Sequence, residues 1–280
     1  MKKHEETKGL LNKNISTDSI FDYLAKIKKK IECLISIDNN SFIAIMEDFW
    51  DFIISIDKDK IVDKLEDNSH YLEYKIFFAE KWHIYISLIE RIKTESFLSN
   101  NCEVLNDSKS ILSKEDYIGV EKELALAGDS FNGCSIAMIG CGPFPETLME
   151  IYKYNPTVKM AIGIDNREDV VKISNNIIKR IFPQSLNIKT IVSDATHFNY
   201  SSIDVIFLAN GLIGKDNILK QIYRTASVNT KVLVRNPILM GKILYEDIYE
   251  LSQFPKFNVL KSVQSSKLGK TLLMSIKDGL

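Results

Sequence analysis

Two glycines and two aspartates in the second half of the chain have the spacing of a nucleotide-binding site. Gly140 and Gly142 follow a short apolar run, residues 135–139, and Asp165 and Asp194 each follow a later run. Glycine lets the backbone approach a ligand closely, and an acid ending the second strand can bond ribose hydroxyls. Asp194, after the third strand, is placed to reach an adenine. We therefore predict a nucleoside-containing ligand; the alternative is a tight turn with solvated acids.

The residues after the second glycine argue against a dinucleotide. Pro143, Phe144 and Pro145 stand where small residues would let a helix N-terminus close on a pyrophosphate. Each proline stiffens the loop and removes an amide donor. S-adenosylmethionine has no phosphate and would lose little from such a turn. We expect S-adenosylmethionine to be the ligand.

The elements that must position these residues are strands alternating with helices. Apolar runs cover Ser135–Ile139, 159–164, Ile188–Val192, 204–208, 231–234 and 271–276, and helical stretches such as 169–181 and 216–225 lie between them. This alternation predicts a mostly parallel sheet with right-handed crossovers. We therefore expect a Rossmann-like α/β domain over residues 131–280.

The first 130 residues have a different pattern. Ile20, Leu24, Ile27, Ile31 and Leu34 recur at spacings of three and four, behind a capping sequence at residues 16–18. Further helices are expected over 41–56, 68–98 and 114–127. Since no alternating strand pattern occurs here, residues 1–130 are predicted to form an all-α helical-bundle domain.

Composition and charge weigh against several classes of protein. The formal net charge of −1 gives no overall attraction to nucleic acid. The four cysteines form no CxxC pair and have no histidine at metal-ligand spacing, so we expect free thiols and no metal. No run approaches the roughly 20 apolar residues of a membrane helix, and the polar N-terminus lacks a signal core. These features predict a cytoplasmic protein with neither nucleic-acid nor membrane partners; its oligomeric state is left open.

The stretch IGCGPFPETL, residues 139–148, resembles the G-x-G-P-x-P-x-T turn of the nicotianamine synthase family. The segments GID (163–165), SDAT (193–196), DVIFLANGLIG (204–214) and VRNPILMGKILY (234–245) follow in the family's order, so that the resemblance covers about residues 85–275. The family includes bacterial enzymes that make opine metallophores of the staphylopine and pseudopaline type. It transfers the 3-amino-3-carboxypropyl (aminobutanoyl) group of S-adenosylmethionine to an amine and releases 5′-methylthioadenosine. The resemblance implies the same activity here, with an amino acid such as histidine as acceptor and a role in metallophore biosynthesis.

The resemblance also implies roles for individual residues. Glu90 matches the family's proton-accepting glutamate, with Glu95 as the nearest rival on the same helix, and Tyr117 matches its orienting tyrosine. Arg235 and Tyr245 would contact substrate. The residues expected to hold the donor are Gly140, Gly142, Pro143, Asp165, Asp194 and Ala195.

Each of these assignments has a plainer alternative. Glu90 could be a solvated acid, Tyr117 a surface aromatic, Arg235 a partner in a structural ion pair, and Tyr245 a core residue. Glu146, Leu239 and Gly241 depart from the family pattern, which leaves the acceptor open. Two other functions remain: an S-adenosylmethionine-dependent methyltransferase with a helical cap, and a non-catalytic ligand-binding module.

Overall fold

The computed structural model describes residues 16–34, 40–56, 59–99, 114–128 and 131–277, without the side chains of residues 59–60 and 114–117. The chain divides into two compact units. The first, which we call the helical unit, comprises residues 1–89 and 237–245; the second, the sheet unit, comprises residues 90–236 and 246–280. The expectation of separate domains divided near residue 130 stays a prediction.

The helical unit contains α2 (Thr17–Glu32), α3 (Asn40–Ile54), α4 (Asp59–Glu66), the first part of α5 (Tyr71–Ser99) and a 3₁₀ helix, η1 (Leu239–Ile243). A capping box starts α2: the Ser16 hydroxyl accepts from the Ser19 amide at 3.2 Å, and the Ser19 hydroxyl accepts from the Ser16 amide at 3.1 Å. The apolar stripe predicted for this helix is buried from Ile20 to Ile31, whereas Leu34 lies beyond the end of the helix and is half-buried. Phe49 of α3 and Phe78 of α5 are also buried, and their rings stack at 4.4 Å. Helix α4 was not predicted, because it is only eight residues long and five of them are charged.

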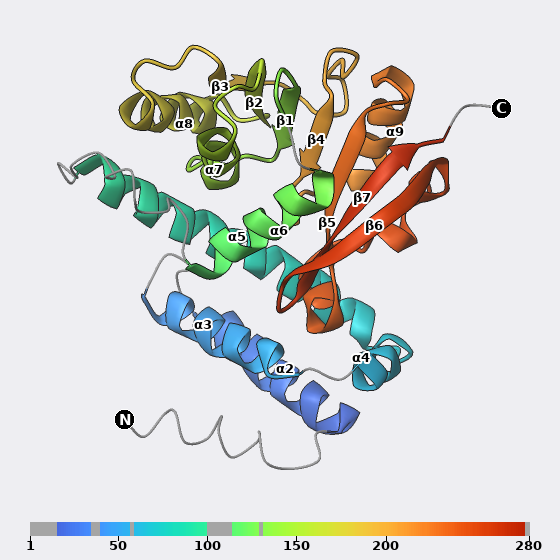
Figure 1. Ribbon diagram of the computed structural model, residues 1–280. Coiled ribbons are helices and arrows are strands. Elements are labelled where there is room, and N and C mark those ends of the chain that lie inside the picture. The colour runs from blue at the N-terminus through green and yellow to red at the C-terminus, as the bar shows by residue number, and fades with distance from the viewer. Residues whose placement is uncertain (1–15, 35–39, 57–58, 100–113, 129–130, 278–280) are drawn as a thin grey trace. The chain divides into compact units, whose positions relative to one another are not determined.

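The sheet unit is built on seven strands in the order β3-β2-β1-β4-β5-β7-β6 (Figure 1). These are β1 (Ser135–Ile139), β2 (Met160–Asp165), β3 (Ile188–Val192), β4 (Val205–Leu208), β5 (Lys231–Pro237), β6 (Phe257–Ser266) and β7 (Gly269–Ile276). Strands β1 to β5 pair in parallel, and β6 and β7 form an antiparallel hairpin. The strand order reverses at β1, between β2 and β4, and ligands of open α/β sheets bind beyond the carboxyl ends of strands at such a point.

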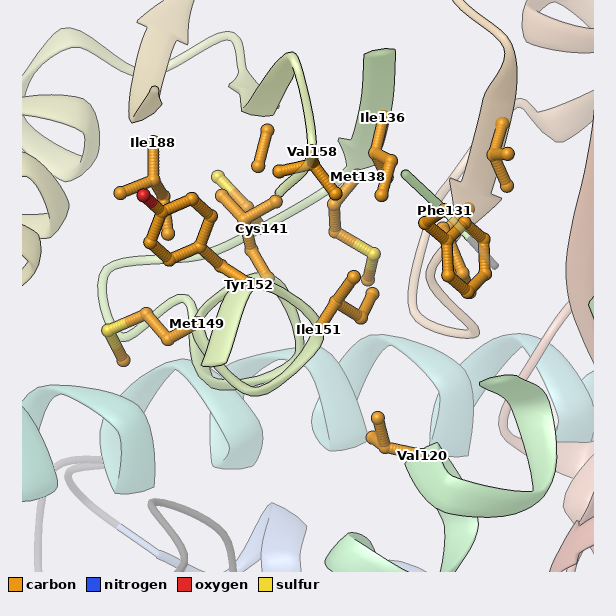
Figure 2. Packing of buried hydrophobic residues seen from close by; sticks show 14 of the residues in the cluster. Val120, Phe131, Ile136, Met138, Cys141, Met149, Ile151, Tyr152, Val158 and Ile188 are labelled. Carbon is orange, nitrogen blue, oxygen red and sulfur yellow. The ribbon is translucent and has the colours of Figure 1, made fainter. Parts of the chain in front are cut away.

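Both faces of the sheet are covered, which explains the continuous apolar runs of its inner strands. Ile136 and Met138 of β1 pack into one core with residues of α6 (Lys114–Ala127), α7 (Glu146–Tyr154) and α8 (Glu168–Ile181), part of which is drawn in Figure 2. Ala137 and Ile139 point to the opposite core, which includes three apolar residues of α9 (Lys215–Thr225). This α/β architecture with a preceding helical region is the predicted fold class.

Strand β6 is the main element that the sequence pattern missed. It is an edge strand in which only Phe257 is buried, and Val259 and Leu260 are exposed. Because neither face has a run of buried positions, no apolar signature marks it. Two further 3₁₀ helices, η2 (Ile248–Glu250) and η3 (Phe254–Lys256), precede β6. Among the described helices, none is long and apolar enough to span a bilayer.

Candidate active site

The turn that leaves β1, residues 140–145, requires glycine at two positions. Gly140 and Gly142 have φ angles of 73° and 66°, which are in the left-handed region that disfavours other residues. The amide of Gly140 donates to the Ile164 carbonyl at 2.9 Å, and a Cβ at residue 140 would lie 2.7 Å from the Leu212 side chain. We call residues 140–145 the glycine–proline turn.

Asp165, at the end of β2, ties this turn to the start of the next helix. Its carboxylate accepts hydrogen bonds from the Gly142 amide at 3.3 Å and the Arg167 amide at 3.1 Å, and the Arg167 Nε lies 3.4 Å from the same group. Asp165 is 9% exposed. The acid predicted from its strand-end position is therefore held rigidly beside the turn, with little contact with bulk water.

The proline part of the turn leads into α7. Pro145 is the N-cap residue of this helix and makes no side-chain capping bond, and Phe144 is buried. Pro143 and Pro145, just before this helix, thus lack an amide hydrogen, as expected for a turn that does not bind a pyrophosphate.

Glu90, on α5 within the sheet unit, faces the same turn. Its two carboxylate oxygens lie 3.2 and 3.3 Å from the position that a Cβ would occupy at residue 142. Burial raises the pKa of Glu90, and the Asp165 charge acts in the same direction, whereas Arg167 and Lys93 partly offset both effects. Gly142 is therefore next to two acids. Its amide donates to Asp165, and the Glu90 carboxylate lies where a side chain at residue 142 would project. A partly buried carboxylate with a raised pKa is a suitable proton acceptor near neutral pH.

The loop after β3 holds Asp194 in a different environment. The Asp194 carboxylate accepts from the Thr196 amide at 2.8 Å and from the Thr196 hydroxyl at 2.7 Å, and the His197 ring lies 3.0 Å away. The hydrogen bonds from Thr196 lower the pKa of Asp194, whose side chain is 55% exposed. Ala195 is half-buried, and its carbonyl accepts from the Tyr200 hydroxyl at 2.8 Å. The local turn thus keeps Asp194 ionised and exposed.

Arg235, on β5, makes a bidentate ion pair within the sheet unit. Its Nε and Nη2 atoms each lie 2.8 Å from an oxygen of Glu123 on α6, and Nη2 also donates to the Thr147 hydroxyl at 3.2 Å. Glu123 is 1% exposed and accepts a further hydrogen bond from Thr271 at 2.6 Å. These contacts support the structural alternative for Arg235, and its contact with substrate stays a prediction.

The two predicted tyrosines are placed differently. Tyr117 lies in α6, but its side chain is outside the described residues. Tyr245 belongs to the helical unit, where its hydroxyl accepts a hydrogen bond from the Trp82 indole at 2.5 Å. Neither residue's expected role is tested by these observations.

Sequence reasoning missed several polar residues near the turn. Lys93, one helical turn after Glu90, forms an ion pair with Glu146 at the start of α7. Within the described part of the chain, the buried oxygens of Thr94 Oγ1 and Asn210 Oδ1 have no hydrogen-bond partner. Asn210 follows β4, the strand that pairs with β1, and the Ala209-Asn210-Gly211 sequence at this strand end was the available signal. A polar ligand group could satisfy such an atom.

Comparison with known proteins shows the fold. No family model and no curated protein sequence matches the chain. Among solved structures it is similar to MtNAS, a nicotianamine synthase. A Glu-to-Gln variant of MtNAS in complex with S-adenosylmethionine has a TM-score of 0.75 at 17% identity, over 92% of this chain and 98% of that chain. MtNAS in complex with MTA and tNA has a TM-score of 0.77 at 16% identity, over the same shares.

This chain has the fold of MtNAS. The likeness extends over both units and confirms the predicted fold class, a Rossmann-like sheet preceded by helices. At 16–17% identity the likeness shows the fold alone, and the chemistry has to be argued from the site residues. In the part of the chain that the structure describes, no cluster of three or more His, Cys, Asp or Glu could hold a metal ion.

Proposed function

We propose that this chain is an S-adenosylmethionine-dependent aminocarboxypropyltransferase that uses an amine acceptor and releases 5′-methylthioadenosine. The observation that carries the proposal is the partly buried carboxylate of Glu90 against Gly142, in a turn that is also tied to Asp165. Further support comes from the fold shared with MtNAS, which was crystallised with S-adenosylmethionine and with MTA.

The proposed reaction is a displacement at carbon. The lone pair of a neutral amine attacks the methionine Cγ, a nitrogen–carbon bond forms, and the carbon–sulfur bond breaks. The electron pair of the broken bond stays on sulfur, which converts the sulfonium into the neutral thioether of 5′-methylthioadenosine. Because the sulfonium already makes a good leaving group, the protein's task is to position the amine and accept its proton.

In this proposal Glu90 accepts the amine proton. Free α-amines are largely protonated at neutral pH, so the amine must lose a proton before it attacks, and a nearby carboxylate with a raised pKa is placed to accept that proton. Tyr117 is proposed to orient the amine, and Tyr117→Phe should reduce turnover less than loss of the carboxylate. Asp165 is proposed to bind the donor ribose and Asp194 the adenine side.

The remaining assignments of the proposal rest on the turn and its neighbours. Gly140, Gly142, Pro143 and Ala195 would line the donor site with backbone and apolar contacts. Arg235 and Tyr245 would contact the substrates. The acceptor is proposed to be an amino acid such as histidine, and the product an opine-type metallophore.

Product analysis tests the reaction class directly. Purified protein is incubated with S-adenosylmethionine and candidate amines, histidine among them, and the nucleoside product is identified by mass spectrometry. We expect 5′-methylthioadenosine together with an acceptor that has gained the aminocarboxypropyl group. Formation of S-adenosylhomocysteine with a good acceptor would instead establish methyl transfer, and binding without turnover would indicate a ligand-binding module.

A further inference from the structure

The face of α5 that carries Glu90 contacts the glycine–proline turn at a second point. Lys93 follows Glu90 by three residues, so both side chains project from one side of the helix. The Lys93 ammonium pairs with the Glu146 carboxylate and lies 5.1 Å from the centre of the Phe144 ring. Glu90 lies against Gly142 of the same turn.

A third contact continues along the helix. The Phe97 ring, one turn beyond Lys93, meets Phe144 edge to face at 5.3 Å. Arg180 of α8 donates hydrogen bonds to the Phe97 and Leu98 carbonyls at 3.1 and 3.2 Å, near the end of α5. Glu90 thus contacts Gly142, and Lys93 and Phe97 contact Phe144, from successive turns of one helix and all within the sheet unit.

We propose that Lys93 and Glu146 form a positioning pair that holds the Glu90 carboxylate against the glycine–proline turn and balances the charge beside it. The inference deepens the proposed function and rests on it, since it assigns residues that act on the proton acceptor. Glu146 is the acid that departs from the family pattern of the turn. Its ion pair with Lys93 gives that departure a physical role, because it joins the start of α7 to the helix that carries Glu90.

The charges around Glu90 decide what the pair does. Asp165 of β2 disfavours ionisation of Glu90, and Arg167, just before α8, and Lys93 favour it. Cys141, in the turn, is close enough to Glu90 that the Glu90 charge helps to raise the pKa of the Cys141 thiol. Glu146 on α7 forms an ion pair with Lys93. We therefore expect Glu146 to offset the effect of Lys93, so that the two members of the pair act on the ionisation of Glu90 with opposite signs.

Two single substitutions give opposite expectations. Lys93→Met removes a cation that favours ionised Glu90, so the pKa of Glu90 should rise. Glu146→Gln leaves the Lys93 charge unbalanced, so the pKa should fall. A unit charge several ångströms away through a partly solvated path predicts a shift of about half a pH unit in each case. If the pair has a purely structural role, either variant would loosen the turn and admit water to Glu90. The pKa of Glu90 would then fall in both variants.

The experiment is a carboxyl NMR titration of the ligand-free protein labelled with [δ-¹³C]glutamate. Glu90→Gln assigns the Glu90 resonance, and Glu95→Gln removes an exposed acid of the same helix as a matched control. We expect opposite shifts for Lys93→Met and Glu146→Gln, no shift for Glu95→Gln, and a near wild-type titration for the Lys93→Met/Glu146→Gln double variant. Unmoved Glu90 titration, or shifts in one direction for both variants, would overturn the inference.

Turnover supplies a second measurement that separates this inference from the proposed function. The Lys93→Met/Glu146→Gln double variant removes one positive and one negative charge, so Glu90 should titrate as in the wild type. Because the ion pair is lost, this variant should form 5′-methylthioadenosine several-fold more slowly. Lys93→Arg keeps the cation and should retain the wild-type rate. Wild-type rates in the double variant would remove the positioning role. If the wild-type protein forms no 5′-methylthioadenosine while the NMR shifts appear, the transferase proposal fails and the electrostatic coupling of Lys93, Glu146 and Glu90 stands.

Discussion

The carboxylate of Glu90 occupies the space into which a side chain at Gly142 would project. Its oxygens are 3.2 and 3.3 Å from that Cβ position, and Gly142 has a φ of 66°. The two residues are 52 positions apart in the sequence, yet the Glu90 carboxylate can lie there only because residue 142 has no side chain. Several predictions about the site depend on this contact.

Gly142→Ala should abolish most activity through two separate effects. The left-handed backbone costs an alanine roughly 1–2 kcal/mol, and the added methyl group pushes the Glu90 carboxylate away. Gly133→Ala is the matched control, because Gly133 has a similar φ of 69° but no atom within 4 Å of its Cβ position. Both variants should lose similar stability in urea unfolding, and only Gly142→Ala should lose turnover. Equal activity in the two would show that Glu90 need not lie against the turn.

Glu90→Gln should lower turnover by roughly the 10²–10⁴-fold typical of a general base. The amide keeps the shape of the side chain but cannot accept the proton, so donor affinity should change little. Single-turnover assays at saturating donor measure this, with Glu95→Gln as the control. Because burial raises the pKa of Glu90, the acid limb of the kcat/KM profile should lie above the ordinary range of a glutamate. Normal product formation by Glu90→Gln, with a dead Glu95→Gln, would move the role to the rival carboxylate.

Asp165→Ala should weaken S-adenosylmethionine binding at least about tenfold. Charge-assisted hydrogen bonds of the kind proposed to the ribose are worth roughly 1.5–3 kcal/mol each. Asp194→Ala should have a smaller effect because that carboxylate is exposed and already bonded within its own loop. Calorimetry compares both with Asp169→Ala, which removes an exposed acid at the start of α8. Unchanged affinity in a folded Asp165→Ala protein would remove Asp165 from the donor site.

Arg235→Met should destabilise the sheet unit by about 3 kcal/mol. The substitution leaves the buried Glu123 carboxylate without the bidentate partner, and breaking a buried pair from one side is costly. In the double variant Arg235→Met/Glu123→Leu no buried charge remains, so urea unfolding should recover most of the loss. Activity then decides the role of Arg235. A stable double variant with a normal KM supports the structural pair, and one with a raised KM supports a contact with a substrate carboxylate.

Lys215→Met should change how stability depends on alkaline pH. Lys215 is fully buried, its ammonium bonds the Glu246 carbonyl at 3.2 Å, and burial lowers its pKa from 10.5 to about 8. Between these two values the unfolded chain holds a proton that the folded protein has released, so the contribution of Lys215 to stability rises with pH across that window. The rise amounts to roughly 3 kcal/mol.

Urea unfolding from pH 7 to pH 10.5 measures the Lys215 effect. The wild-type protein should gain stability relative to Lys215→Met as the pH rises, whereas Lys220→Met, an exposed lysine of the same helix, should follow the wild type. Parallel curves for Lys215→Met and the wild type would show that the buried ammonium keeps its ordinary pKa.

Local pattern alone was enough for the class of fold and the place of the turn. Apolar runs that alternate with helices indicate a parallel sheet because its inner strands are buried on both faces, as β1 is. The positive φ angles at Gly140 and Gly142 agree with a turn that needs glycine. Strand-end acids such as Asp165 could also be placed, since parallel strands end at one edge. Strand β6 escaped because an exposed edge strand has no such pattern.

Tertiary structure alone decided which charges meet. The partners Lys93 and Glu146, and Arg235 and Glu123, lie 53 and 112 positions apart, and no local spacing links them. Burial of Lys215 was equally invisible, because a lysine at the start of a helix is normally solvated. The pKa of Glu90 depends on Asp165 and Arg167, which lie 75 and 77 positions away in the sequence. Burial and Coulomb interactions are properties of distance in space, so the sequence by itself determined the scaffold and the candidate residues, and packing determined their chemistry.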